Sequence, residues 1–372
     1  MTWHFRCATC DFTGDSAQIL WRCPNCGGEL LIEGLPELLE SVDQSRPGLW
    51  RYRLLLPVQG PDTGSILGEG DTPLVPFEID NVRIHLKVDS QLPTGSFKDR
   101  GAAVLCQYLK EIGVRRIIVD SSGNAAASMA AYAAATGLEC TVFVPATASP
   151  GKLVQARASG ATVIPIEGSR DDVATAAQTA ADEDQSASYA SHNWHPVFVE
   201  GVKTWAFEVH EQLGGRNPDR VFAPAGGGSS FVGAWRGFSA TGSRLPGIIA
   251  AQPEACAPIV RAWKEKAPIR RMEAGPTIAE GTKIAEPPRA RQIARVLEHP
   301  AAGAIAVDEE LLISTLKQLW AGGIYCEPTG ALGVAAFRIA LSRNEVDPDE
   351  LIVAHITGHG LKSTAAINDL LE

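Results

Sequence analysis

One lysine stands where a loop gives way to a helix. Residues 93–100 read Pro-Thr-Gly-Ser-Phe-Lys-Asp-Arg, and an apolar run with helical spacing follows over 101–109. We expect Ser96 to be the N-cap and Asp99 to complete a capping box. Lys98 then lies in the first helical turn, where the positive end of the helix dipole disfavours an ammonium ion. A partly neutral lysine can bond covalently to an aldehyde; a solvated lysine is the alternative interpretation.

Four cysteines near the start have the spacing of a metal site. They follow the pattern C-x2-C-x12-C-x2-C, and two glycines after the second pair allow the positive φ of a tight knuckle. Without a secretory signal, disulfides are the weaker interpretation. The pattern predicts a zinc ribbon, with Zn²⁺ in a structural role because thiolates fill all four positions. The predicted ligands are Cys7, Cys10, Cys23 and Cys26.

A glycine-rich turn stands between an apolar run at 221–223 and a helical segment at 231–238. It reads Pro-Ala-Gly-Gly-Gly-Ser-Ser over 224–230. Consecutive glycines let backbone N–H groups converge on one anion, and a helix N-terminus adds partial positive charge. The turn is neither a dinucleotide loop nor a P-loop, because neither motif is present. It predicts a phosphate cradle.

Two further polar turns follow expected strands. Ser-Ser-Gly-Asn at 121–124 comes after the strand 116–120, and Asn124 is the expected N-cap of a helix over 125–136. Thr-Gly-His-Gly-Leu-Lys at 357–362 follows the last apolar run, and we expect a structural role for His359.

Strand-like and helical segments alternate through most of the chain, which predicts an α/β fold. Residues 82–88 alternate as a strand and lead to the lysine motif. Apolar runs at 140–144, 162–166, 247–251, 304–307 and 351–356 each neighbour a helical segment. This rhythm is typical of βαβ units in mainly parallel sheets, with ligands at the carboxyl ends of the strands.

These turns together resemble the motifs of the fold type II pyridoxal-phosphate (PLP) enzymes. That family includes threonine synthase, threonine and serine dehydratases and the cysteine-synthase group. Residues 93–101 resemble its lysine motif, 121–124 its loop over the cofactor ring, 68–74 its entry segment and 357–362 a threonine-synthase phrase. The resemblance implies two parallel-sheet α/β domains beside the ribbon, in the architecture of the tryptophan synthase β subunit.

The resemblance also implies a role for each site residue. Lys98 would bind the cofactor aldehyde and remove the substrate Cα proton. Asn124 would contact the phenolic oxygen, and Thr357 the ring nitrogen. The predicted phosphate-binding residues are Gly226, Gly227, Gly228, Ser229 and Ser230. The predicted binding residues for the substrate carboxylate are Ser121, Ser122 and Thr94.

The resemblance favours threonine synthase, which converts O-phosphohomoserine and water to threonine and phosphate. One position departs from its pattern: Phe198 stands where an arginine reaches the substrate phosphate. Losing such a charge-assisted partner is not conservative. Arg100, Lys152, His192 and Lys203 could supply the missing charge. A threonine or serine dehydratase, diaminopropionate ammonia-lyase or β-replacement synthase therefore remains the alternative, and residues 277–281 and 327–331 lean that way.

Bulk properties narrow the partners. The net charge of −10 over 372 residues argues against a nucleic-acid surface. The sequence contains no run of 18 apolar residues, so we expect no membrane span. The absence of a signal-peptide pattern favours the cytoplasm. The family implies a homodimer and a small amino-acid substrate. We expect the ribbon at 1–33, an arm and the first part of the large domain at 34–92, a small mobile domain at 93–165, and the rest of the large domain at 166–372.

Overall fold

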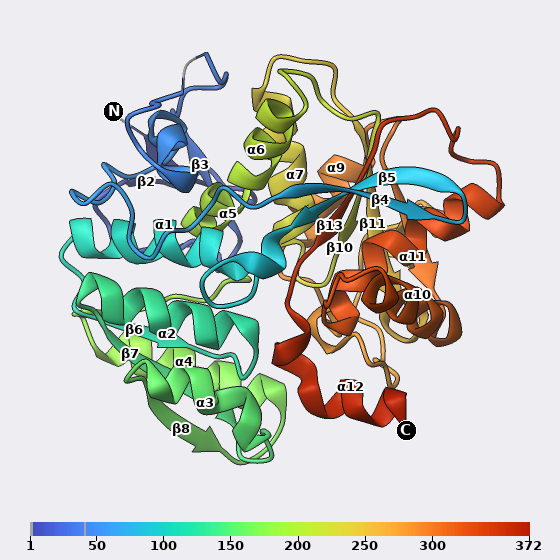
Figure 1. Ribbon diagram of the computed structural model, residues 1–372. Helices are drawn as coiled ribbons and strands as arrows, with labels where there is room; N and C mark the ends of the chain where they lie inside the picture. Colours follow the sequence, from blue (N-terminus) through green and yellow to red (C-terminus); the bar gives the residue numbers. More distant parts are fainter. Residues whose placement is uncertain (1–2, 41) are drawn as a thin grey trace. The chain divides into compact units, whose positions relative to one another are not determined.

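The computed structural model describes residues 3–40 and 42–372, and its chain divides into two compact units (Figure 1). Unit 1 comprises Met1–Asp71, Leu92–Thr94 and Lys98–Thr204. Unit 2 comprises Thr72–Gln91, Gly95–Phe97 and Trp205–Glu372. The chain therefore passes between the units just before the lysine motif and again within it. The domain boundaries expected from the sequence stay a prediction.

Unit 1 begins with a small antiparallel sheet. Its strands are β1 (His4–Cys7), β2 (Thr13–Asp15) and β3 (Leu30–Glu33), in the order β2-β1-β3. Tyr108 anchors this ribbon, because its hydroxyl donates to the carbonyls of Ser16 and Gln18 at 2.9 and 3.1 Å. Trp21 packs edge-on against Tyr189 with ring centroids 4.6 Å apart. Aromatic contacts thus hold the ribbon against the rest of unit 1.

The second sheet of unit 1 is fully parallel, as the strand–helix rhythm predicts. Its order is β8 (Thr162–Ile166), β7 (Glu139–Pro145), β6 (Arg116–Val119) and β9 (Ala187–Tyr189). The helices of unit 1 are η1 (Gly48–Leu55), α1 (Lys98–Glu111), α2 (Asn124–Thr136), α3 (Pro150–Ala158), α4 (Arg170–Glu183) and α5 (Pro196–Val202). Helix α2 is mostly alanine, so α1 packs closely along it.

Unit 2 contains a six-stranded sheet. Its order is β12 (Gly303–Val307), β11 (Gly247–Pro253), β10 (Arg220–Pro224), β13 (Ile352–Ile356), β5 (Val82–Val88) and β4 (Leu74–Ile79), with only β4 antiparallel to its neighbour. The helices are η2 (Asp89–Gln91), α6 (Thr204–Gln212, whose first residue is the last of unit 1), α7 (Ser229–Ala240), η3 (Glu254–Cys256), α8 (Pro258–Glu265), η4 (Glu280–Thr282), α9 (Ala290–Leu297), α10 (Glu309–Ala321), α11 (Pro328–Ser342), η5 (Gly360–Ser363) and α12 (Thr364–Leu371).

The core of unit 2 explains why this sheet is stable. Helix α11 packs across β10, β11, β12 and β13, and α10 packs on α11. Buried aliphatic residues from these helices and strands form one cluster. Strands buried in this way read as near-continuous apolar runs, as these strands do. The α/β fold with mainly parallel sheets is confirmed, and the carboxyl ends of β10 and β13 lie next to each other in it.

Candidate active site

A buried carboxylate of unit 1, Asp99, holds the part of the lysine motif that belongs to this unit. The Asp99 Oδ2 atom accepts a hydrogen bond from the backbone N–H of Thr94 at 2.7 Å, and the Thr94 hydroxyl donates to Oδ1. The Ser128 hydroxyl, on α2, also donates to Oδ1 at 2.6 Å. Asp99 therefore fixes Thr94 in the loop before Lys98 and joins the first turn of α1 to the second turn of α2.

Two capping predictions were wrong in detail. The Ser96 hydroxyl is buried with no hydrogen-bond partner among the described residues, so the expected capping box with Asp99 does not form. Asp99 bonds Thr94 instead. Asn124 is the first residue of α2 rather than its N-cap, which is Gly123. Both helices nevertheless begin at the predicted site residues, Lys98 and Asn124.

The Ser-Ser-Gly-Asn turn of unit 1 leaves room for a ligand. It follows β6, and the backbone N–H of Gly123 donates to the Ser121 hydroxyl at 3.3 Å. A Cβ atom at Gly123 would meet no atom within 4 Å. Ser121, Ser122 and Asn124 are partly exposed. The backbone of this turn is therefore accessible at the carboxyl end of β6, where ligands bind in parallel sheets.

Phe198 lies under the lysine. Its side chain is fully buried, and its ring centroid is 5.9 Å from the Lys98 Nζ atom. A Cβ atom added to Gly101, one turn into α1, would come within 2.5 Å of this ring. The His192 ring lies edge-on at 6.0 Å. The position of the missing arginine is thus filled by an aromatic packing residue with a histidine beside it.

The cations that could replace that arginine differ in their surroundings. The Lys203 Nζ atom donates to Glu200 Oε2 at 2.6 Å and to the Leu55 carbonyl at 2.8 Å. Arg100 is fully buried and donates to the Thr204 hydroxyl at 3.2 Å. Lys152 is exposed on α3. His192, beside Phe198, is the candidate in direct contact with that ring.

The loop predicted to hold a phosphate lies in unit 2. The glycine loop, residues 225–228, links β10 directly to α7. Gly228 is the N-cap of α7 with a φ of +92°, a left-handed conformation that favours glycine. A Cβ atom at Gly226 would lie 2.8 Å from the Thr282 Cα atom, so only glycine fits there. The loop and the N-terminus of α7 together present N–H groups and a partial positive charge, a combination that fits a phosphate.

Thr357 follows β13 and carries an unsatisfied hydroxyl. Its Oγ1 atom is buried with no hydrogen-bond partner among the described residues. A buried polar atom without a partner is costly, and a ring nitrogen would satisfy it. The Thr357 carbonyl accepts from the Phe97 N–H at 2.9 Å. His359 caps η5, where its Nδ1 atom accepts from the Leu361 N–H at 3.2 Å, in agreement with the structural role expected for it.

The four ribbon cysteines converge. Their sulfur atoms all lie within 4.8 Å of one another. Burial raises the pKa of the Cys7 thiol, but the N–H groups of Cys10 and Thr9 and the neighbouring thiols lower it to about 6. The pKa of the Cys10 thiol is raised to about 12, because burial and its thiol neighbours outweigh the N–H group of Phe12. A bound dication would stabilise all four cysteines as thiolates.

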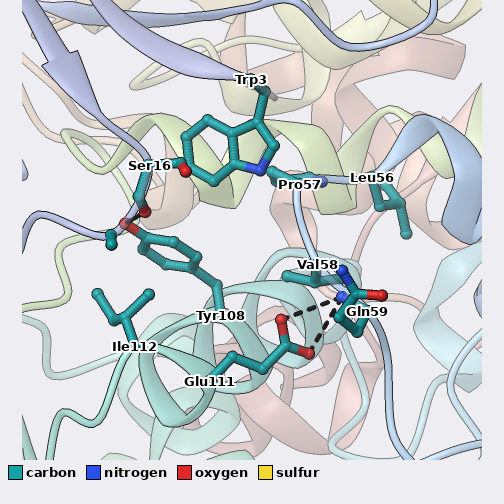
Figure 2. A pocket seen from close by; sticks show the side chains of 10 residues that line it. Trp3, Ser16, Leu56, Pro57, Val58, Gln59, Tyr108, Glu111 and Ile112 are labelled. Carbon is teal, nitrogen blue, oxygen red and sulfur yellow. Dashed lines mark hydrogen bonds between the residues drawn. The ribbon is translucent and has the colours of Figure 1, made fainter. Parts of the chain in front are cut away.

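A pocket of about 170 Å³ lies elsewhere in unit 1 (Figure 2). Ribbon residues, the segment 56–59 and the last turn of α1 line it. Glu111 accepts from the Gln59 N–H at 3.1 and 3.0 Å, and Trp3 and Tyr108 supply aromatic walls. Lys98 begins α1 whereas this pocket lies at its other end, about 20 Å away at 1.5 Å per residue. It contains none of the predicted cofactor residues.

Some buried polar residues were missed in the sequence. They are Lys87, Asp89, Glu208 and His355 of unit 2, all fully buried. For Lys87 in β5 and His355 in β13, the available signal was a charged or imidazole side chain within a buried strand. Within the described residues, no helix is long and apolar enough to cross a membrane.

Comparison with known proteins defines the class. The model of the family "Pyridoxal-phosphate dependent enzyme" matches residues 66–358. The chain belongs to this family of PLP-dependent enzymes. The unsatisfied Thr357 hydroxyl and the glycine loop fit such a cofactor.

The chain is also similar to individual threonine synthases and to solved enzyme structures. The chain is 34% identical over 97% of its length to the threonine synthase of Methanocaldococcus jannaschii, of which it covers 93%. It is 30% identical to that of Methanosarcina acetivorans, over 100% of this chain and 95% of the relative. A solved T.th. threonine deaminase superposes with a TM-score of 0.67 and 26% identity, over 77% of this chain and 92% of that one. An L-serine ammonia-lyase from Rhizomucor miehei, 19% identical, shares the fold with a TM-score of 0.72 over 81% of this chain and 97% of that one.

Proposed function

We propose that the protein is a threonine synthase, acting on O-phosphohomoserine and water to give threonine and phosphate. The observation that carries the proposal is similarity to threonine synthases at 34% and 30% identity over almost the whole chain. The lysine motif, the glycine loop and the Thr357 turn follow one another along the chain in the order that the family resemblance implies.

Residue roles follow from the family and from the local geometry of each turn. Lys98 binds the cofactor aldehyde, and Asn124 binds the phenolic oxygen. The N–H groups of Gly226, Gly227 and Gly228, with Ser229 and Ser230, bind the phosphate. The Thr357 hydroxyl donates to the ring nitrogen. With the cofactor bound, a hydroxyl at this position would leave the ring nitrogen largely unprotonated.

The substrate is held and deprotonated by residues of unit 1. Ser121 and Ser122, with the N–H groups of their turn, bind the α-carboxylate. Thr94 was predicted to join them, but its N–H and hydroxyl both donate to Asp99, so it holds the lysine turn instead. When bound, the cofactor ring delocalises the negative charge that develops at Cα. The Lys98 amine removes the Cα proton and returns it later as a general acid. His192 is the side chain we assign to the leaving phosphate, because it lies beside Phe198 where the family arginine is absent.

A dehydratase or ammonia-lyase is the second candidate, and one observation favours it. The fully buried Phe198 ring offers no charge to a phosphate dianion, and suits a smaller, uncharged leaving group. Elimination followed by release of a keto acid would then replace the addition of water.

The two candidates differ in their products. The PLP-loaded protein is incubated with O-phospho-L-homoserine, and phosphate and amino products are followed together. We expect phosphate and threonine in equal amounts. Keto-acid release from L-serine, L-threonine or diaminopropionate, without threonine formation, would support the lyase instead. A His192→Gln variant should lose turnover of the phosphorylated substrate.

The lysine is tested separately. Lys98→Ala should abolish the visible absorbance of lysine-bound cofactor, whereas Lys110→Ala, at the exposed end of α1, should keep it. Absence of the band in the wild type would contradict the assignment of Lys98.

The remaining assignments concern the ribbon and the assembly. We propose that Cys7, Cys10, Cys23 and Cys26 bind one structural Zn²⁺, since their sulfurs lie within reach of one ion. We also propose a cytoplasmic homodimer, by analogy with the family. Light scattering on the purified protein would measure its mass, and a monomer would contradict the homodimer.

A further inference from the structure

The pocket at the end of α1 has a mainly apolar wall (Figure 2). The ribbon, the segment 56–59 and the last turn of α1 line it, and all three belong to unit 1. Trp3 and Tyr108 form its aromatic side, with ring centroids 5.6 Å apart. Its aliphatic side is formed by Leu56, Val58 and Ile112. Mainly apolar walls with a few polar groups are typical of small-molecule sites.

One carboxylate lines this apolar space. The Glu111 Oε1 atom accepts from the Gln107 Nε2 atom at 2.8 Å, and from the backbone N–H groups of Gln59 and Gly60, both at 3.1 Å. Its Oε2 atom accepts only from the Gln59 N–H, at 3.0 Å, among the described residues. A carboxylate oxygen can accept two hydrogen bonds. The Oε2 atom can therefore accept one more, from a ligand.

The charge of Glu111 is not balanced by a basic side chain. All of its donors are neutral, and no lysine, arginine or histidine in the described part of the chain forms an ion pair with it. Glu111 is the last residue of α1, so the partial negative charge of a helix C-terminus lies at the same place. The neighbouring Lys110 is exposed and does not line the pocket.

A second carboxylate adds to this negative charge. Burial raises the pKa of the Tyr108 hydroxyl, and the charge of Asp15 raises it further, so Asp15 lies close to the aromatic side of the pocket. The Asp15 Oδ1 atom accepts from the Ala17 N–H at 2.7 Å. The faces of tryptophan and tyrosine rings also attract cations. Charge and aromatic walls thus favour a cation in this pocket over an anion.

We propose that this pocket binds a small organic ammonium ion that has an apolar body and no carboxylate group. The ammonium N–H donates to Glu111 Oε2, and the apolar body contacts Trp3, Tyr108 and Val58. A free amino acid fits poorly, because its carboxylate would lie near Glu111 with no basic lining residue to receive it. The ligand therefore differs in class from the amino-acid substrate of the proposed reaction, and the inference does not depend on that reaction.

Three ring compounds separate charge from shape. Piperidine is a cation at neutral pH, tetrahydropyran has an oxygen in place of its nitrogen, and pipecolate adds a carboxylate. Piperidine is a secondary amine, so it does not form with pyridoxal phosphate the imine that a primary amine forms. Ligand-observed NMR titrations of the full-length, cofactor-loaded protein measure the dissociation constants. We expect piperidine to bind roughly tenfold more tightly than tetrahydropyran. Pipecolate should fail to displace piperidine.

Substitutions in the pocket test which groups provide the preference for a cation. Glu111→Gln keeps the shape and removes the charge, so it should weaken piperidine binding about tenfold and leave tetrahydropyran binding unchanged. Trp3→Leu should weaken piperidine binding more than tetrahydropyran binding, because an aromatic face is lost. Glu183→Gln is the matched control, since Glu183 is the exposed last residue of α4 and does not line the pocket. Added salt should reduce the preference for piperidine.

Several results would overturn the proposal. They are the absence of piperidine binding, equal affinities for piperidine and tetrahydropyran, and displacement of piperidine by pipecolate. Piperidine binding that is unchanged in Glu111→Gln would place the ligand elsewhere and would also refute it. If Glu111→Gln fails to fold, the Trp3→Leu variant gives the same comparison, and full retention of the preference for piperidine in that variant would contradict the site.

Discussion

The backbone N–H of Phe97 donates to the carbonyl of Thr357 at 2.9 Å. This hydrogen bond ties the lysine motif to the end of β13, and a bridge between Ser96 and Gly358 lies beside it. Lys98 is the next residue along the chain. Two residues 260 positions apart in the sequence, one in the predicted lysine turn and one in the predicted ring-nitrogen turn, thus share one stretch of backbone pairing.

Asp99 should be essential to the lysine turn. In Asp99→Asn the shape is kept, but an amide donor replaces one of the oxygens that accept from Thr94 and Ser128. We expect a loss of about 2 kcal/mol in the free energy of unfolding, because hydrogen bonds to a buried charge are the costly ones to lose. Urea denaturation measures this loss. Asp62→Asn, in an exposed loop, is the control and should be neutral; equal stability of both variants would refute the role of Asp99.

The contact between α1 and Phe198 should not tolerate a methyl group. In Gly101→Ala the new Cβ would lie 2.5–2.6 Å from three ring carbons of Phe198. We expect destabilisation of about 1–3 kcal/mol from overpacking. Gly151→Ala in α3, whose Cβ would meet nothing closer than 3.8 Å, should instead stabilise the protein slightly, because alanine is the better helix former.

The same contact permits a double-mutant test. Phe198→Leu makes room for the methyl group, so its combination with Gly101→Ala should cost less than the two single effects together. Strict additivity in thermal or urea unfolding would show that the close approach is not the cause.

The ribbon should bind metal through all four thiols. We expect roughly one Zn²⁺ per chain in the purified protein, and a marked loss of metal and of thermal stability in Cys23→Ser, since a structural zinc site is closed by four ligands. Elemental analysis and thermal unfolding provide the two measurements. Cys140→Ala, in β7, should keep the metal. A wild type purified in zinc-containing medium with no bound metal would contradict the site.

Lowering the pH should reduce the free energy of unfolding through the protonation of His85. Burial lowers the pKa of this imidazole below 6.5, and the charges of Arg83 and Arg216 lower it further. The unfolded chain then binds the proton more readily than the folded one. The stability contributed by neutral His85 is therefore fully present above pH 6.5 and is lost as the pH falls towards the folded pKa.

The His85 effect is measured as a slope. The free energy of unfolding of the wild type should decline between pH 6.5 and the lower pKa, and His85→Gln should flatten that decline. His299→Gln should leave it unchanged. A decline that is identical in wild type and His85→Gln would assign it to other groups.

Much of the fold could be predicted from the sequence because strands and helices depend on local residue patterns. The strands at β8 and β5 coincide with the predicted runs, and α2 ends at the residue expected. The capping details failed because a tertiary partner intervened: Asp99 is drawn to Thr94 and Ser128, and Ser128 lies on another helix. The sequence identified Phe198 as a departure from the family pattern. It could not show that Gly101 and His192 lie against the Phe198 ring.

The sequence alone determined the strand–helix rhythm, the cysteine ribbon and the turns with the lysine and the glycines. Each of these depends on spacing within about ten to thirty residues, where backbone geometry links sequence to structure directly. Only the tertiary structure shows that Asp89 and His355, which are 266 positions apart, form a hydrogen bond. Buried charges must be balanced by whichever partners the fold brings within hydrogen-bond distance, and that pairing has no local pattern.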